Sequence, residues 1–218
     1  VGAANTIFTA TTPCGLEANK YYLWVVPTTY KDKLGNQNST TVKSTGTFWI
    51  DNTAPTITLG AQKNETWAKT HNVTVTLADA HSGLAAGTSQ SVKYGWSTSK
   101  TAEPTEWTQV KLTEYAEGTL SVSFTATGSG LTGKYYLWVK PVQLKDVAGN
   151  AQTGTKISED TYWFDNQEPT ITVTPTSIED SESVQITIVS KNTPMAANTP
   201  CSQGCFASAE AADMVIVP

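Results

Sequence analysis

The hexapeptide Lys-Tyr-Tyr-Leu-Trp-Val occurs twice, at residues 20–25 and again at 134–139. The surrounding sequence repeats at the same offset of 114 residues (134 − 20): TFWIDN at 47–52 returns as TYWFDN at 161–166. The tetrapeptide FTAT at 8–11 also returns, with a two-residue slip, at 124–127. One β-sandwich domain has about 100 residues, and self-similarity at such a spacing is typical of tandem domains. We therefore expect repeated units of sandwich size.

The repeats are out of phase with the ends of the sequence. Residues 54–167 form one whole unit, residues 1–53 match only the second half of a unit, and residues 168–218 match only the first half. The motifs DNTAPT and DNQEPT place Pro55 and Pro169 where the chain would leave one unit and enter the next. We refer to these three parts as the N-terminal half-unit, the middle unit and the C-terminal half-unit.

Alternating polar and apolar residues predict strands throughout. Runs such as NVTVTLA at 72–78 and SVQITIV at 183–189 have the period of two and the β-branched residues of strands. We find no convincing helical periodicity longer than about ten residues. The sequence therefore predicts an all-β protein: tandem β-sandwiches, one complete and two half units.

Charge and composition argue against several classes of protein. The net charge is −5 and all 14 basic residues are lysines, whereas nucleic-acid binding relies on arginine forks and basic clusters. No apolar run approaches the ~20 residues of a membrane-spanning helix. The only histidines, His71 and His81, lie in no nucleophile or metal-ligand motif, so we expect no enzyme activity. Threonine-rich strands with three cysteines favour an extracellular location.

The motifs resemble those of the bacterial immunoglobulin-like (Big-type) repeats in large cell-surface proteins and adhesins. The resemblance rests on LADAHSGL at 77–84, on GKYYLWV at 133–139, on DVAGN at 146–150, and on FWIDNTAPT at 48–56. It covers most of residues 1–173 and fades beyond them. It implies immunoglobulin-like sandwiches that act as spacers, stalks or adhesive modules on the bacterial surface.

Two sets of side chains are candidates for binding. The first is an aromatic set, expected to share one outer face of the sheet in each copy: Tyr22, Trp24, Trp49, Tyr136, Trp138 and Trp163. This face could bind a sugar or a protein, or its rings could form a cross-strand ladder that stiffens the sheet. The second set is at the unit boundaries, near the turns with Asp32, Asp79 and Asp146: Asp51, Asn52, Asp165 and Asn166. These oxygens could bind Ca²⁺ as a cofactor, or they could cap turns.

The three cysteines leave two disulfide patterns open. Cys14 lies in the N-terminal half-unit, and Cys201 and Cys205 lie in the C-terminal one. One of the latter could pair with Cys14 and join the two half-units, or Cys201 and Cys205 could close a local loop and leave Cys14 free.

The half-units lead to a functional hypothesis. Half a sandwich exposes an apolar face and open strand edges. Either the chain is an excerpt of a longer tandem protein, or the last half-unit of one chain completes the first half-unit of the next. The second reading gives a head-to-tail filament by strand complementation. The alternative function is a carbohydrate- or protein-binding accessory module of a secreted protein.

Overall fold

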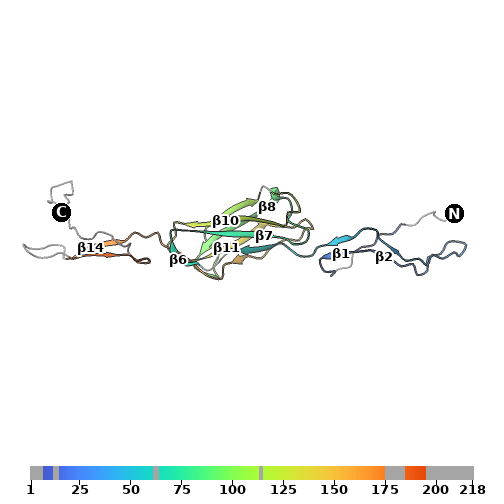
Figure 1. Ribbon diagram of the computed structural model, residues 1–218, viewed down its shortest axis with the longest axis horizontal. Coiled ribbons are helices and arrows are strands. Elements are labelled where there is room, and N and C mark those ends of the chain that lie inside the picture. The colour runs from blue at the N-terminus through green and yellow to red at the C-terminus, as the bar shows by residue number, and fades with distance from the viewer. Residues whose placement is uncertain (1–6, 12–14, 61–63, 113–114, 175–184, 195–218) are drawn as a thin grey trace, which may run out of the picture.

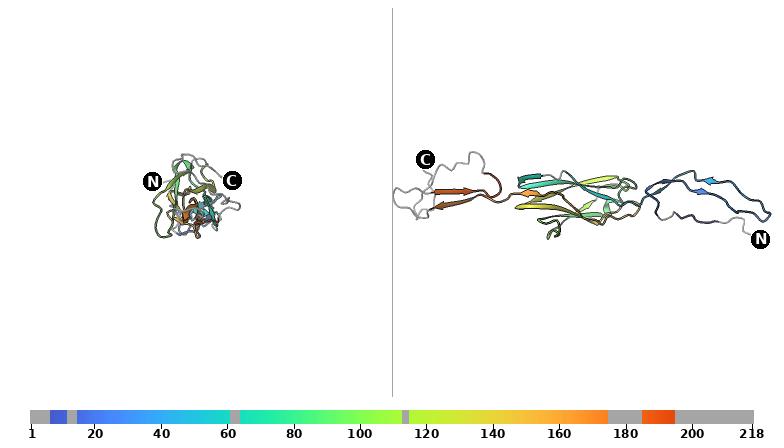
Figure 2. Two further views of the ribbon diagram at one scale, coloured as in Figure 1. Left: turned by 90° about the vertical axis from the view of Figure 1, so that its left-hand side faces the viewer. Right: turned by 90° about the horizontal axis from the view of Figure 1, so that it is seen from below.

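The computed structural model describes residues 7–11, 15–60, 64–112, 115–174 and 185–194. Within these residues every regular element is a β-strand except one short 3₁₀ turn, η1 (Gly87–Ser89), which confirms the all-β prediction. A helix that could span a membrane is not found among these described residues. The molecule is elongated, and residues 15–53 and 168–174 extend from opposite ends of the middle unit (Figures 1 and 2).

The middle unit is a sandwich of two sheets. The smaller sheet has the order β10-β7-β5 and is antiparallel; its strands are β5 (Thr56–Leu59), β7 (Thr70–Ala78) and β10 (Ser121–Ser129). The larger sheet has the order β6-β13-β11-β8-β9, and β12 pairs with β11. Its strands are β6 (Asn64–Ala68), β8 (Gln90–Ser97), β9 (Thr108–Leu112), β11 (Gly133–Gln143), β12 (Lys156–Ile157) and β13 (Tyr162–Phe164). Among the described strands, β6 and β13 are the only parallel pair.

The predicted alternation explains how the core forms. Along β7, Val73, Val75 and Leu77 are buried, while the threonines between them point outward. From the opposite sheet, Leu137 and Val139 of β11 join the same core. A period of two puts every second side chain of a strand on the inner face, so one apolar stripe per strand is enough to fill the space between two sheets.

The N-terminal half-unit repeats the pairing of the middle unit. Its strands are β1 (Asn19–Tyr21), β2 (Trp24–Val25), β3 (Val42–Lys43) and β4 (Phe48–Ile50). β1 pairs with β4 in the register of β11 with β13, so that Tyr21 lies opposite Phe48 as Tyr135 lies opposite Tyr162. β2 pairs with β3 as β11 pairs with β12. The offset of 114 residues therefore holds in the hydrogen-bond register as well as in the sequence.

The C-terminal half-unit contains an antiparallel pair, β14 (Thr170–Thr174) and β15 (Gln185–Val189). Ile171 lies opposite Ile188 in the way that Ile57 of β5 lies opposite Leu77 of β7. β14 and β15 are thus the counterparts of β5 and β7. Cys14, Cys201 and Cys205, on which the disulfide hypotheses depend, lie outside the described residues.

Candidate functional site

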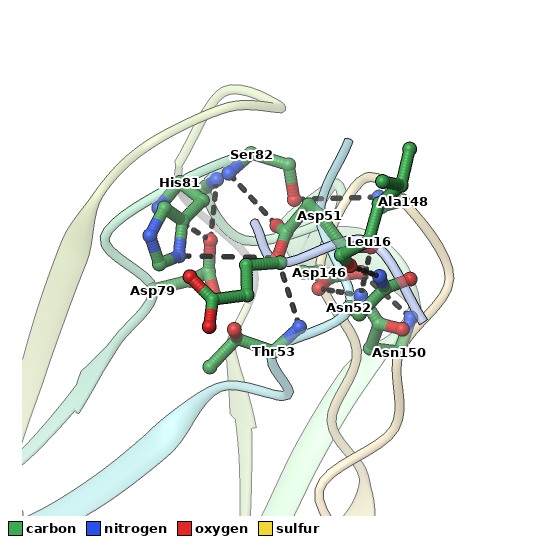
Figure 3. A network of polar contacts seen from close by, with 12 residues as sticks. Leu16, Asp51, Asn52, Thr53, Asp79, His81, Ser82, Asp146, Ala148 and Asn150 are labelled. Carbon is green, nitrogen blue, oxygen red and sulfur yellow. Dashed lines mark hydrogen bonds and ion pairs between the residues drawn. The ribbon is translucent and has the colours of Figure 1, made fainter. Parts of the chain in front are cut away.

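Three carboxylates meet where the N-terminal half-unit joins the middle unit. Asp51 directly follows β4, Asp79 directly follows β7, and Asp146 lies in the turn after β11. Each offers an oxygen, and the three oxygens lie within 4.8 Å of one another (Figure 3). Asp79 and Asp146 are buried, and the Asp51 side chain is only 5% exposed. Three segments far apart in the sequence therefore bring three negative charges to one largely enclosed place.

Tight turns hold two of these carboxylates in position. Asp79 Oδ1 accepts hydrogen bonds from the backbone N–H groups of His81 (3.1 Å) and Gly83 (2.8 Å). Asp146 accepts from Asn150, through the backbone N–H (2.7 Å) and through the side-chain amide (2.7 Å). Aspartate is favoured in such turns because its side chain bonds to backbone N–H groups a few residues ahead.

Asp51 connects the two units. Its carboxylate accepts from the backbone N–H of Thr53 (2.9 Å) and from that of Ser82 (3.0 Å), and its backbone carbonyl accepts from the Asn150 amide (3.0 Å). His81 Nδ1 lies 3.9 Å from Asp51 Oδ1. Burial raises the pKa of Asp51, but hydrogen bonds from Ser82 and Thr53 and the charge of His81 outweigh it and hold the pKa below its ordinary value. Asp51 is therefore ionised at neutral pH.

The cluster suits a hard divalent cation. Ca²⁺ takes six to eight oxygen ligands, with carboxylates as the usual charged ones. Three carboxylates at this distance repel one another, and the repulsion grows as solvent is excluded. A bound cation would remove that repulsion, and Asp51, Asp79 and Asp146 are the residues that would hold it.

The four residues predicted from the sequence as possible calcium ligands lie in two pairs, one at each boundary of the middle unit. Of these, Asp51 joins the carboxylate cluster, whereas the Asn52 amide donates to the carbonyl of Leu16 (2.5 Å). Asp165 lies at the other end of the middle unit, where Asn192 (3.3 Å) and Thr193 (3.0 Å) donate to it. The fourth residue, Asn166, donates its amide to the carbonyls of Lys69 (3.2 Å) and Leu131 (2.6 Å). Both asparagines thus tie the chain together at their own junctions.

The aromatic face of the middle unit differs from the expected open surface. Trp138 is buried, because the connection between β8 and β9 (residues 98–107) folds over it and the Ser99 carbonyl accepts its indole N–H (3.1 Å). Tyr136 and Trp163 are partly exposed. Lys134 lies 3.8 Å from the centroid of the Trp163 ring, and Lys100 lies 5.1 Å from that of Tyr136. Cation–π contacts therefore occupy part of this face.

The matching face of the N-terminal half-unit is open. Tyr22, Trp24 and Trp49 are all exposed. Lys43 lies 3.5 Å from the Tyr22 ring centroid, and Lys20 lies 4.1 Å from that of Trp49. Trp24 is 57% exposed, whereas Trp138, at the same place in the repeat, is 5% exposed. The described part of the half-unit has no counterpart of residues 98–107, and this explains the difference.

The inner face of the N-terminal half-unit is also uncovered. Leu23 is 39% exposed where Leu137 is 0% exposed, and Phe48 is 51% exposed where Tyr162 is 1% exposed. Local structure does not cause this, since the Leu23 N–H bonds to the Ser44 hydroxyl (3.1 Å) as the Leu137 N–H bonds to that of Ser158 (3.0 Å). In the middle unit the β10-β7-β5 sheet provides the cover. Among the described residues, no second sheet faces this side of the half-unit.

Comparison with known proteins adds no identification: no family model, curated protein or solved structure matches the chain.

Proposed function

We propose that this chain is a structural segment of an extracellular repeat protein, of the kind that forms stalks, adhesins or filaments on bacterial surfaces. The observation that carries the proposal is the repetition of one sandwich plan along the chain. The strand pairs of the N-terminal half-unit recur in the middle unit in the same register, 114 residues later, and the β14–β15 pair repeats the pairing of β5 with β7. The three segments are arranged end to end (Figure 1). The strand orders β10-β7-β5 and β13-β11-β8-β9 are consistent with the immunoglobulin-like resemblance. The function is to span distance and transmit force.

The junction suits this role because it restricts bending between units. Asn150 donates to the backbone of Asp51, and Ser82 donates to its side chain, so the linker is bonded to two separate turns of the middle unit. We further propose that Ca²⁺ binds Asp51, Asp79 and Asp146 and stiffens the joint. A rod gains length and resists bending only when its joints are rigid.

Small-angle X-ray scattering of the whole chain, with and without calcium, tests this function. We expect a rod-like particle whose longest dimension increases or becomes better defined with Ca²⁺. A compact particle, with the half-units folded back on the middle unit, would contradict the proposed spacer role.

Calorimetric titration with CaCl₂ tests the metal site separately. Asp79→Asn and Asp146→Asn should each abolish binding, because they remove charge while keeping side-chain size. Asp32→Asn is the matched control, because Asp32 holds the same turn in the N-terminal half-unit, where Asn36 donates to it (2.6 Å). Within the described residues Asp32 belongs to no cluster of three carboxylates. Equal loss of binding in the control, or no binding by the unmodified chain, would exclude the proposed site.

Ligand binding is the second candidate, because a cleft of about 450 Å³ lies at the same junction. Trp49, Lys20 and His81 line it, and Trp49 is well exposed. An exposed indole beside polar groups suits a sugar ring. Trp49→Ala should then abolish binding on a glycan array without unfolding the middle unit, while Trp107→Ala, at another surface tryptophan contacted by Lys93, should not.

A further inference from the structure

A cleft of about 530 Å³ opens between the two sheets on one side of the middle unit. On this side β9 is the last described strand of the larger sheet, and β10 is the last described strand of the smaller one. The lining comes from β8, β9, β10 and β11 and from the connection between β8 and β9. All of these residues belong to the complete middle unit, so the cleft depends neither on the half-units nor on the carboxylate cluster.

The lining includes aromatic rings that are held in fixed positions. These rings belong to Tyr94, Trp96, Trp107 and Tyr135. Phe164 makes T-shaped contacts with Trp96 (5.2 Å between centroids) and with Tyr135 (5.8 Å). The Trp96 indole N–H also donates to the carbonyl of Thr127 (3.3 Å). Rings that are already immobilised lose little conformational entropy when a ligand binds.

Two glycines let the walls of the cleft come close together. A Cβ at Gly95 would lie 2.5 Å from the Glu106 carbonyl oxygen, so the segment that carries Glu106 and Trp107 packs directly against the backbone of β8. A Cβ at Gly128 would lie 2.7 Å from Cε2 of Trp96. The missing side chains therefore allow Glu106 and the tryptophans to surround one space.

The charge of the lining favours a cation. Among the described residues that line the cleft, Glu106 is the only charged one, and it is exposed. The whole chain has a net charge of −5. Beside the cleft, the Lys93 ammonium lies 4.4 Å from the centroid of the Trp107 ring, so this ring already attracts one cation. An anionic ligand would meet a carboxylate here and no basic group of the lining.

We propose that this cleft binds a small organic cation with a quaternary ammonium group, of the kind that choline carries. The faces of aromatic rings attract such a cation through their quadrupoles, and cages of tryptophan and tyrosine are suited to its size and shape. Glu106 adds a direct charge attraction. A sugar fits the lining less well, because its neighbouring hydroxyl groups need planar amide or carboxylate side chains, and Glu106 is the only one among the described lining residues.

Choline and its neutral analogue, in which carbon replaces the nitrogen, test the role of the charge. The two molecules have nearly the same shape. In NMR titrations of the whole chain, choline should shift the indole N–H signals of Trp96 and Trp107 until the site is saturated, whereas the analogue should leave them almost unchanged. Equal binding of the two molecules, or no saturable shift with choline, would overturn the proposal. Tighter binding of an acetylated lysine amide than of choline would also overturn it, and would assign the cleft to a lysine side chain.

Two charge-changing variants should alter the affinity for choline in opposite directions. Glu106→Gln keeps the size of the side chain but removes its charge, so choline should bind about 2–5-fold more weakly. Lys93→Gln removes a neighbouring positive charge, so choline should bind more tightly. Glu103→Gln is the matched control, because Glu103 lies in the same connection but pairs with Lys140 (2.6 Å), and neither residue lines the cleft. Unchanged affinity in both test variants, or an equal loss in the control, would exclude the proposed site.

Discussion

Leucine at the fourth position of KYYLWV provides an internally controlled mutation, because the same residue occurs in both copies with the same local bonds. Leu137 is fully buried between two sheets, whereas Leu23 faces the uncovered side of the N-terminal half-unit. Replacing each with alanine in separate variants removes the same atoms from the same strand. The difference between the two losses of unfolding free energy therefore measures what the opposing sheet contributes.

The expected difference follows from burial. Leu137→Ala removes fully buried methyl groups and leaves a cavity, which costs about 2–5 kcal/mol. Leu23→Ala in a single copy leaves no enclosed cavity and loses only part of its burial, so we expect about 1 kcal/mol or less. With a urea dependence of about 1–3 kcal/mol per molar, a 3 kcal/mol loss lowers the urea midpoint of the middle unit by about 1–3 M.

Urea unfolding followed by near-UV circular dichroism, at a concentration where the chain is monomeric, provides the assay. A small effect of Leu137→Ala, below about 1 kcal/mol, would refute the assignment of this strand to the core.

Three further predictions concern the middle unit and its junction. Gly83 has φ +78° and an added Cβ would lie 2.3 Å from the Gly118 carbonyl oxygen, so Gly83→Ala should cost more than about 1 kcal/mol in urea unfolding. Ser158→Ala removes the hydroxyl that accepts the buried Leu137 N–H, and we expect a loss of about 1–3 kcal/mol by the same assay. The pKa of Asp51 lies below its ordinary 3.8, so its ionised form stabilises the fold fully above about pH 4, and this contribution is lost as the pH falls through the lowered pKa. In calcium-free thermal scans, Asp51→Asn should therefore melt at a lower temperature than the unmodified chain at about pH 7. This difference in melting temperature should shrink as the pH falls below the ordinary pKa of 3.8; a difference that is the same at every pH would contradict the assignment.

The repeat and the strands could be predicted from the sequence because both depend on local order. An offset of 114 residues needs only a comparison of the chain with itself, and the alternation in β7 shows which side chains share a face. The same alternation in β11 puts Leu137 and Val139 on one face, and both lie in the core. Asp51 could also be named as a possible calcium ligand, because the sequence alone shows a carboxylate at a unit boundary.

The tertiary structure decided what covers each face and which distant groups meet. Trp138 alternates correctly to the outside of its strand, yet it is buried, because a connection some forty residues earlier folds over it. The carboxylates of Asp79 and Asp146 lie beside that of Asp51 because β7 and β11 end at the same end of the sandwich. Periodicity reports the direction of a side chain relative to its own backbone, whereas burial and charge clustering depend on long-range packing. For this reason Leu137 and Trp138 are buried in one copy of KYYLWV. Their counterparts in the other copy, Leu23 and Trp24, are exposed.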